Sequence, residues 1–175
     1  MPLLVSDSVV AHLPGALRLG PPTEALLKGR AGSTLLYPCE GFSEPDTILL
    51  VQSSFDRVAV RSKEFGERFY ANLFKANPEV RSLFQNDLAA QMKMLVSMLS
   101  SLVKGLNRLH EIEGGLRELG KRHRDYNVTP ADYDKLARAL LLTLEEFLAE
   151  DFTPEIRHAW LTSTIALTMV EAAED

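Results

Sequence analysis

Apolar residues recur at helical spacing from about residue 43 to the end of the chain, and capping residues and prolines interrupt this pattern. Positions three and four apart share one side of an α-helix, so the spacing predicts helices that each bury one face. The predicted helices cover residues 43–58, 62–77, 78–84, 88–106, 113–125, 130–150 and 154–175. With roughly seven or eight helices and no convincing strand, this region is expected to be all-α.

Residues 1–44 lack the helical pattern. Six of the nine prolines lie at or before residue 45, and five of the ten glycines precede it, so no long helix fits there. The run Ser33–Tyr37 allows a strand or packing onto the main body, and a largely mobile segment is an equal alternative. We therefore interpret residues 1–44 as a Pro/Gly-rich N-terminal extension of partly irregular structure, followed by one helical domain over residues 45–175.

Composition narrows the class of protein. Apolar residues make up 46% of the chain and charged residues 25%, which is typical of a soluble globular protein. A net charge of −5 argues against nucleic-acid binding. Cys39 is the single cysteine, which excludes an intrachain disulfide and a Cys-rich zinc site. The sequence contains no long apolar run and no basic segment typical of a signal peptide, so we expect no membrane span and a cytoplasmic location.

One imidazole follows an apolar helical face near the end of the predicted helix 113–125. His123 lies four residues after Leu119 and seven after Leu116, so the three share one side of the helix. This arrangement can direct a nitrogen ligand toward an apolar bound group. A core histidine bonded to a backbone carbonyl is the alternative, and the spacing alone favours that alternative.

Two further polar residues lie among apolar ones. Gln91 is the one amide in the helical stripe formed with Leu95 and Met98, where a buried amide would need partners for both its ends. An equally good interpretation is that the side chain of Gln91 faces solvent. Tyr70 lies on an aromatic helix face, where a tyrosine usually packs in the core and reaches water with its hydroxyl.

The segment over residues 69–84 resembles the second and third helices of globins. It includes Pro78, which would open the third helix, and Phe84, which in globins wedges against haem. Gln91 then falls where globins carry their distal residue, and Leu95 falls at an apolar haem contact four positions later. These residues resemble the distal half of a globin haem pocket.

The segment over residues 119–133 is similar to the proximal segment of flavohaemoglobins and bacterial single-domain haemoglobins, with His123 at the position of the iron ligand. The segments follow one another in the globin order, and the resemblance covers residues 45–175. It implies a three-on-three globin fold around a haem b.

The resemblance also implies roles for individual residues. Those implied to form the haem pocket are Tyr70, Phe84, Gln91, Leu95, His123, Val128 and Tyr133. His123 would ligate the iron, and its second nitrogen would donate a hydrogen bond that fixes the ring. Tyr70 and Gln91 would donate to a dioxygen ligand, which gains negative charge. Glutamine does not readily ligate iron, so the sixth position is expected to be open, or held loosely by Tyr70 in the ferric state.

Flavohaemoglobins surround the proximal histidine with a tyrosine ten residues later and a glutamate late in the last helix. Tyr133 matches the tyrosine. The position of that glutamate corresponds to Asp175 or a residue beside it, and Glu171 and Glu174 are nearby. The acidic partner of Tyr133 is therefore left open among these three residues. Thr164 replaces an aromatic residue common at its position in those relatives.

The resemblance implies reversible binding of dioxygen, carbon monoxide or nitric oxide, in storage, oxygen transport or scavenging. An alternative is nitric oxide detoxification by a dioxygenase reaction, with Tyr70, Gln91 and Tyr133 as catalytic residues. The chain shows no Gly-rich dinucleotide fingerprint, so an external reductase would supply the electrons.

Two other functions and two assembly states stay open. A haem-based gas sensor would act through the N-terminal extension, and a haem-free globin-like interaction module would use the fold alone. Monomer and homodimer are both compatible with the sequence. The histidines outside the implied pocket are expected in exposed or capping roles: His12, His110 and His158.

Overall fold

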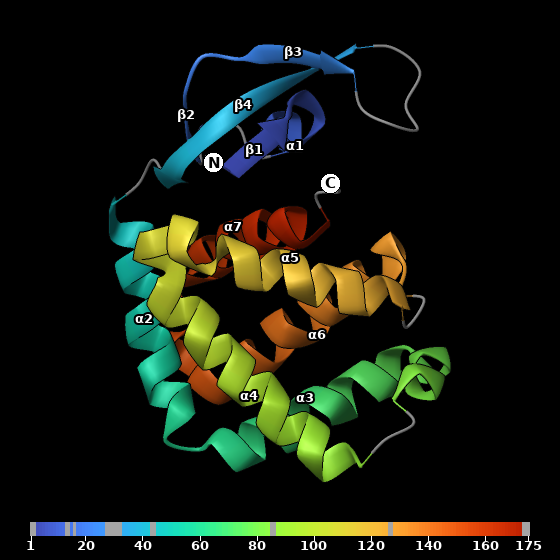
Figure 1. Ribbon diagram of the computed structural model, residues 1–175. Helices are drawn as coiled ribbons and strands as arrows, with labels where there is room; N and C mark the ends of the chain where they lie inside the picture. Colours follow the sequence, from blue (N-terminus) through green and yellow to red (C-terminus); the bar gives the residue numbers. More distant parts are fainter. Residues whose placement is uncertain are drawn as a thin grey trace.

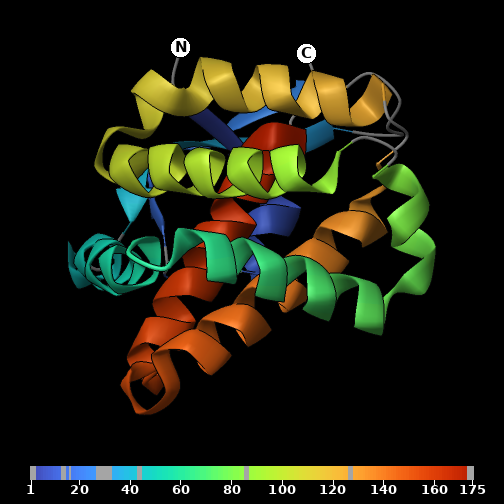
Figure 2. The same cartoon turned by 90° about the horizontal axis from the view of Figure 1, so that it is seen from below.

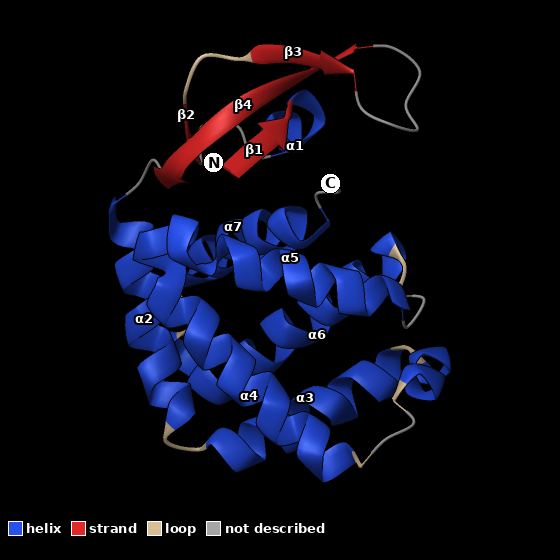
Figure 3. Cartoon of the chain, in the orientation of Figure 1, coloured by secondary structure: helices blue, strands red, loops and turns tan. Residues whose placement is uncertain are grey.

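The computed structural model places a β-sheet above a bundle of helices (Figure 1). The described residues are 3–12, 15, 17–26, 33–42, 45–84, 87–125 and 128–172. Within these ranges the strands all lie before residue 43, and every long helix lies after residue 44 (Figure 3). The all-α class predicted for the main part of the chain is confirmed. None of the helices in these ranges is both long and apolar enough to cross a membrane.

Six α-helices and three 3₁₀ turns follow residue 44 in the described part of the chain. They are α2 (Pro45–Ala59), α3 (Ser62–Ala76), η1 (Pro78–Leu83), α4 (Leu88–Gly105), η2 (Leu106–Arg108), α5 (Leu109–Asp125), α6 (Pro130–Leu148), η3 (Ala149–Asp151) and α7 (Pro154–Ala172). Prolines open α2, η1, α6 and α7, as suits a first turn that needs no backbone donor. Helices α6 and α7 lie side by side, and α3 runs across them (Figure 2).

Helix α5 begins earlier than the sequence predicts, at Leu109 rather than Glu113. The physical reason is Ile112, which packs against the buried side chain of Leu116 and so draws the preceding turn into the helix. A Cβ on Gly105 would lie only 2.5 Å from Cγ2 of Ile112. Glycine at this position therefore lets the end of α4 approach the start of α5 closely.

The N-terminal part forms an antiparallel sheet. Its elements are β1 (Leu3–Ser6), α1 (Asp7–His12), β2 (Leu17–Leu19), β3 (Thr23–Leu26) and β4 (Ser33–Phe42). The long strand β4 is central, with β1 along one edge and β2 and β3 along the other. The run Ser33–Tyr37, for which the sequence left a strand and a mobile segment open, lies in β4.

The sheet packs on the helices through a small apolar cluster. Cys39 of β4 and Leu102 of α4 pack against Leu116 of α5, which is only 2% exposed. Strand β1 also contacts α5 and α7. The N-terminal sheet thus contacts the predicted proximal helix.

The main core lies where α2, α3, α6 and α7 meet. Its fully buried residues include Val51, Val58, Phe65, Leu73 and Leu144. Two polar pairs cross this core. Asn72 Nδ2 donates to Thr143 Oγ1 at 3.1 Å, and Trp160 Nε1 donates to Ser54 Oγ at 2.9 Å. Both pairs join helices that are distant in sequence, so they fix how the helices sit against each other.

Trp160→Phe is expected to lower the free energy of unfolding by about 1 to 3 kcal/mol, because it removes a buried hydrogen bond and part of a ring. Chemical denaturation measures the loss. In a double-mutant cycle with Ser54→Ala, the two changes should couple by about 1 kcal/mol. Strictly additive losses would show that the indole–hydroxyl bond does not stabilise the fold.

Candidate functional site

An aromatic cluster surrounds Tyr70 on α3. Tyr70 is 4% exposed, and its ring meets Phe84 edge to face with centroids 5.3 Å apart. Phe74, one turn after Tyr70, packs against both rings at 5.6 Å. Pro78 ends the helix and opens η1, which returns the chain so that Phe84 meets Tyr70. The predicted contact residues Tyr70 and Phe84 are therefore adjacent, and Phe74 is a third member that the resemblance did not name.

The hydroxyl of Tyr70 is the most unusual group in this cluster. Burial raises the pKa of Tyr70 to about 12, because an apolar environment disfavours the phenolate. Tyr70 is thus a neutral phenol within an aromatic cluster, and a phenol of this kind can donate a hydrogen bond to a bound molecule.

Gln91 and Leu95 lie four residues apart on one face of α4, and both are half-buried. Asp87 caps this helix by accepting a hydrogen bond from the backbone N–H of Ala89 at 2.9 Å. Gly66 of α3 lies so close to α4 that a Cβ there would be 3.2 Å from Cβ of Met92. This close crossing places the N-terminal half of α4 against the helix that carries Tyr70.

Helices α4 and α5 meet at η2 and diverge from there (Figure 1). Gln91 lies near the far end of α4 and His123 in the last turn of α5, so both residues lie away from the junction. The side chain of His123 is outside the described part of the structure, and its role as a ligand stays a prediction. Leu119, one turn earlier on α5, is half-buried.

The remaining predicted pocket residues follow α5. Val128 is half-buried just before α6, and Tyr133 is half-buried in the first turns of that helix. Tyr133 also interacts with another residue. Thr164 is half-buried on α7.

The acidic partner of Tyr133 is not identified. Glu174 and Asp175 lie outside the described residues, as does the side chain of Glu171. The choice among the three acids therefore stays open. His158 is exposed on α7, as expected, whereas the side chains of His12 and His110 are outside the described part.

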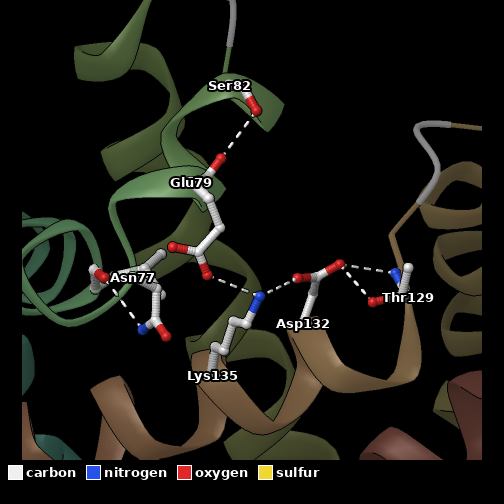
Figure 4. Close-up of polar contacts among 7 residues, drawn as sticks. Asn77, Glu79, Ser82, Thr129, Asp132 and Lys135 are labelled. Atoms are coloured by element: carbon white, nitrogen blue, oxygen red, sulfur yellow. Dashed lines mark hydrogen bonds and ion pairs between the residues drawn. The ribbon is translucent and has the colours of Figure 1, made fainter.

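A charged network joins η1 to the start of α6 (Figure 4). Asp132 accepts hydrogen bonds from Thr129, and these bonds hold the pKa of Asp132 below its usual range. Lys135 lies between Asp132 and Glu79, and hydrogen bonds to the two carboxylates raise the pKa of Lys135. The sequence did not predict this network. The Thr-x-x-Asp capping pattern was a local signal for half of it, but the Glu79 partner is distant in sequence.

Comparison with known proteins defines the class. The family model described as Globin matches residues 67–166, so the chain belongs to the globin family. The globin fold expected from the sequence is thereby confirmed. Globins in general bind haem, and small gases such as dioxygen are ligands of that haem.

Several relatives are similar to parts of this chain. The flavohemoprotein of Oceanobacillus iheyensis is 30% identical over 105 residues, which are 56% of this chain and 26% of that protein. The neuroglobin of Tetraodon nigroviridis is 25% identical over 126 residues, 64% of this chain and 79% of that protein. An uncharacterized globin-like protein of Aquifex aeolicus is 26% identical over 115 residues, 66% of this chain and 81% of that protein. The matches to three flavohemoproteins span only 26% to 32% of their lengths.

The residues of the site fit a haem on the distal side. A flat apolar group can pack against the half-buried ring of Phe84 and the side chain of Leu95. The hydroxyl of Tyr70 is then suited to a polar ligand within an otherwise apolar surrounding. The described residues thus supply the donor and the apolar walls that a haem pocket needs.

Proposed function

We propose that this globin reversibly binds dioxygen at a pentacoordinate haem b. His123 would be the proximal ligand, Tyr70 and Gln91 the distal hydrogen-bond donors, and Leu95 and Val128 part of the apolar wall. When bound, haem supplies an iron whose sixth position takes a gas molecule. The single cysteine, Cys39, lies on β4, which supports noncovalent binding of the haem.

The observation that carries this proposal is the burial of Tyr70 against the rings of Phe74 and Phe84. In such an apolar surrounding, a hydrogen bond from the hydroxyl to a bound ligand is stronger than the same bond in water. The hydroxyl of Tyr70 is protonated at neutral pH and can therefore donate a hydrogen bond, and burial, which raises its pKa to about 12, keeps it protonated in alkaline solution as well. Dioxygen accepts such a bond better than carbon monoxide, because it gains more negative charge.

Purified protein supplied with haem is expected to be red and to show a Soret band. Carbon monoxide added to the reduced protein should shift this band, because an open sixth position takes the gas without displacing a side chain. Absorbance spectra of the full chain make the measurement. A protein that shows no Soret band after haem addition would contradict the proposed function, and a band that carbon monoxide does not shift would contradict an open sixth position.

Nitric oxide oxidation is a second candidate, favoured by the matches to three flavohemoproteins. Tyr70, Gln91 and Tyr133 would act in that reaction, with electrons from a separate reductase. Rapid nitric oxide consumption after addition of a reductase supports this candidate, whereas slow autoxidation without reduction by cell extracts supports simple binding. The sensor alternative stays a prediction, and the contact between Cys39 and Leu116 is the observation in its favour.

A further inference from the structure

Lys135 joins two segments that are far apart in the chain. Its Nζ lies 3.0 Å from Glu79 Oε1 in η1 and 3.0 Å from Asp132 Oδ1 in α6. The side chains of Lys135 and Asp132 are 27% and 12% exposed, whereas that of Glu79 is 62% exposed, so water screens the pair within α6 less than the pair that reaches η1. One cation therefore links η1 to the first turns of α6 (Figure 4).

The α6 end of this link is held by further hydrogen bonds. Asp132 Oδ2 accepts from the backbone N–H of Thr129 at 2.9 Å and from its hydroxyl at 2.7 Å. The backbone N–H of Asp132 in turn donates to the carbonyl of Thr129 at 2.9 Å. Asp132 is thus fixed to the residue that directly follows Val128, an implied contact of the haem.

The η1 end is anchored in the core. Val80, next to Glu79, is 3% exposed and belongs to the main apolar cluster. Phe84 directly follows η1, and its backbone N–H donates to the carbonyl of Arg81 at 3.1 Å. A movement of η1 would therefore move Phe84, whose ring lies against Tyr70.

We propose that Lys135 is a positioning residue that keeps the Phe84 side and the Val128 side of the haem pocket at a fixed spacing. The inference rests on the proposed function, because it assigns the two sides to haem. Lys135 would not touch the reacting atoms. It would act through Glu79 and Asp132, and its consequence would be slow release of the haem.

The test compares haem loss from wild type and Lys135→Met, measured as transfer to an excess of a haem-accepting apoprotein. Lys135→Met is expected to lose haem ~3- to 5-fold faster, because it removes both ion pairs of the link and an ion pair that is partly exposed contributes only a small free energy. Its Soret band should still shift with carbon monoxide. Lys135→Arg should recover slow loss, and Glu79→Gln should add little in the Lys135→Met background.

Lys63→Met is the matched control, because Lys63 forms an exposed pair with Glu67 at 3.9 Å on α3. It should lose haem as slowly as wild type. Denaturation of each apoprotein shows whether faster haem loss merely follows global destabilisation. Equal rates for wild type and Lys135→Met would overturn the inference and leave the proposed function intact. So would faster loss that Lys135→Arg does not recover, or loss that scales with apoprotein stability. A wild type that binds no haem contradicts the proposed function first, and the inference with it.

Discussion

His123→Ala is expected to abolish tight haem binding, with haem loss at least ~100-fold faster than in wild type. Removing groups that only support a metal ligand already costs about 10-fold to 100-fold in affinity, and this change removes the predicted ligand itself. The helix supports the assignment, because His123 lies on the face of α5 that carries the buried Leu116 and the half-buried Leu119.

Haem transfer and the visible spectrum measure this effect in protein supplied with haem after purification. His158→Ala is the matched control, because His158 is exposed on α7 and lies outside the implied pocket. Added imidazole should restore part of the proximal spectrum to His123→Ala by occupying the space of the lost ring. Full, tight haem binding with an unchanged spectrum would refute the assignment of His123.

Tyr70→Phe and Gln91→Ala are each expected to speed dioxygen release by about 10-fold or more. A hydrogen bond to a group that carries charge contributes about 1.5 to 3 kcal/mol, and 1.4 kcal/mol corresponds to a factor of ten. Tyr70→Phe keeps the ring that packs against Phe74 and Phe84, so the fold should change little. Carbon monoxide release should change less, because that ligand gains less charge.

Stopped-flow displacement of dioxygen measures these release rates. Tyr37→Phe is the control for removal of a hydroxyl, because Tyr37 is half-buried on β4 in the N-terminal sheet. Its release rate should match wild type. If neither Tyr70→Phe nor Gln91→Ala changes the rate, the two side chains are not the distal donors.

Most of the helical fold could be predicted because its ends carry local signals. Asp87 and the prolines Pro78, Pro130 and Pro154 mark where helical elements begin, and the structure confirms these starts. The start of α5 lacked such a signal. Leu116 of this helix packs against Leu102 of α4 and Cys39 of β4, and such contacts lie outside a short sequence window.

The sheet and the charged network were harder to predict for one shared reason. Strand β1 pairs Leu3 with Cys39, and Lys135 pairs with Glu79, so in both cases the partners are far apart in sequence. Short periodic patterns do not reveal such partners. The aromatic pair of Tyr70 and Phe84 was predictable only through the resemblance to globins, because a turn separates the two residues.

The contact between the N-terminal sheet and α5 makes the helical part of the chain depend on the sheet for cover of an apolar surface. Cys39 covers part of the apolar strip formed by Ile112 and Leu116, on the helix that carries His123. Removal of the N-terminal sheet would expose this strip to water and raise the tendency of the remaining protein to self-associate. Exchange of this N-terminal segment with that of another globin would thus require compensating substitutions on α5.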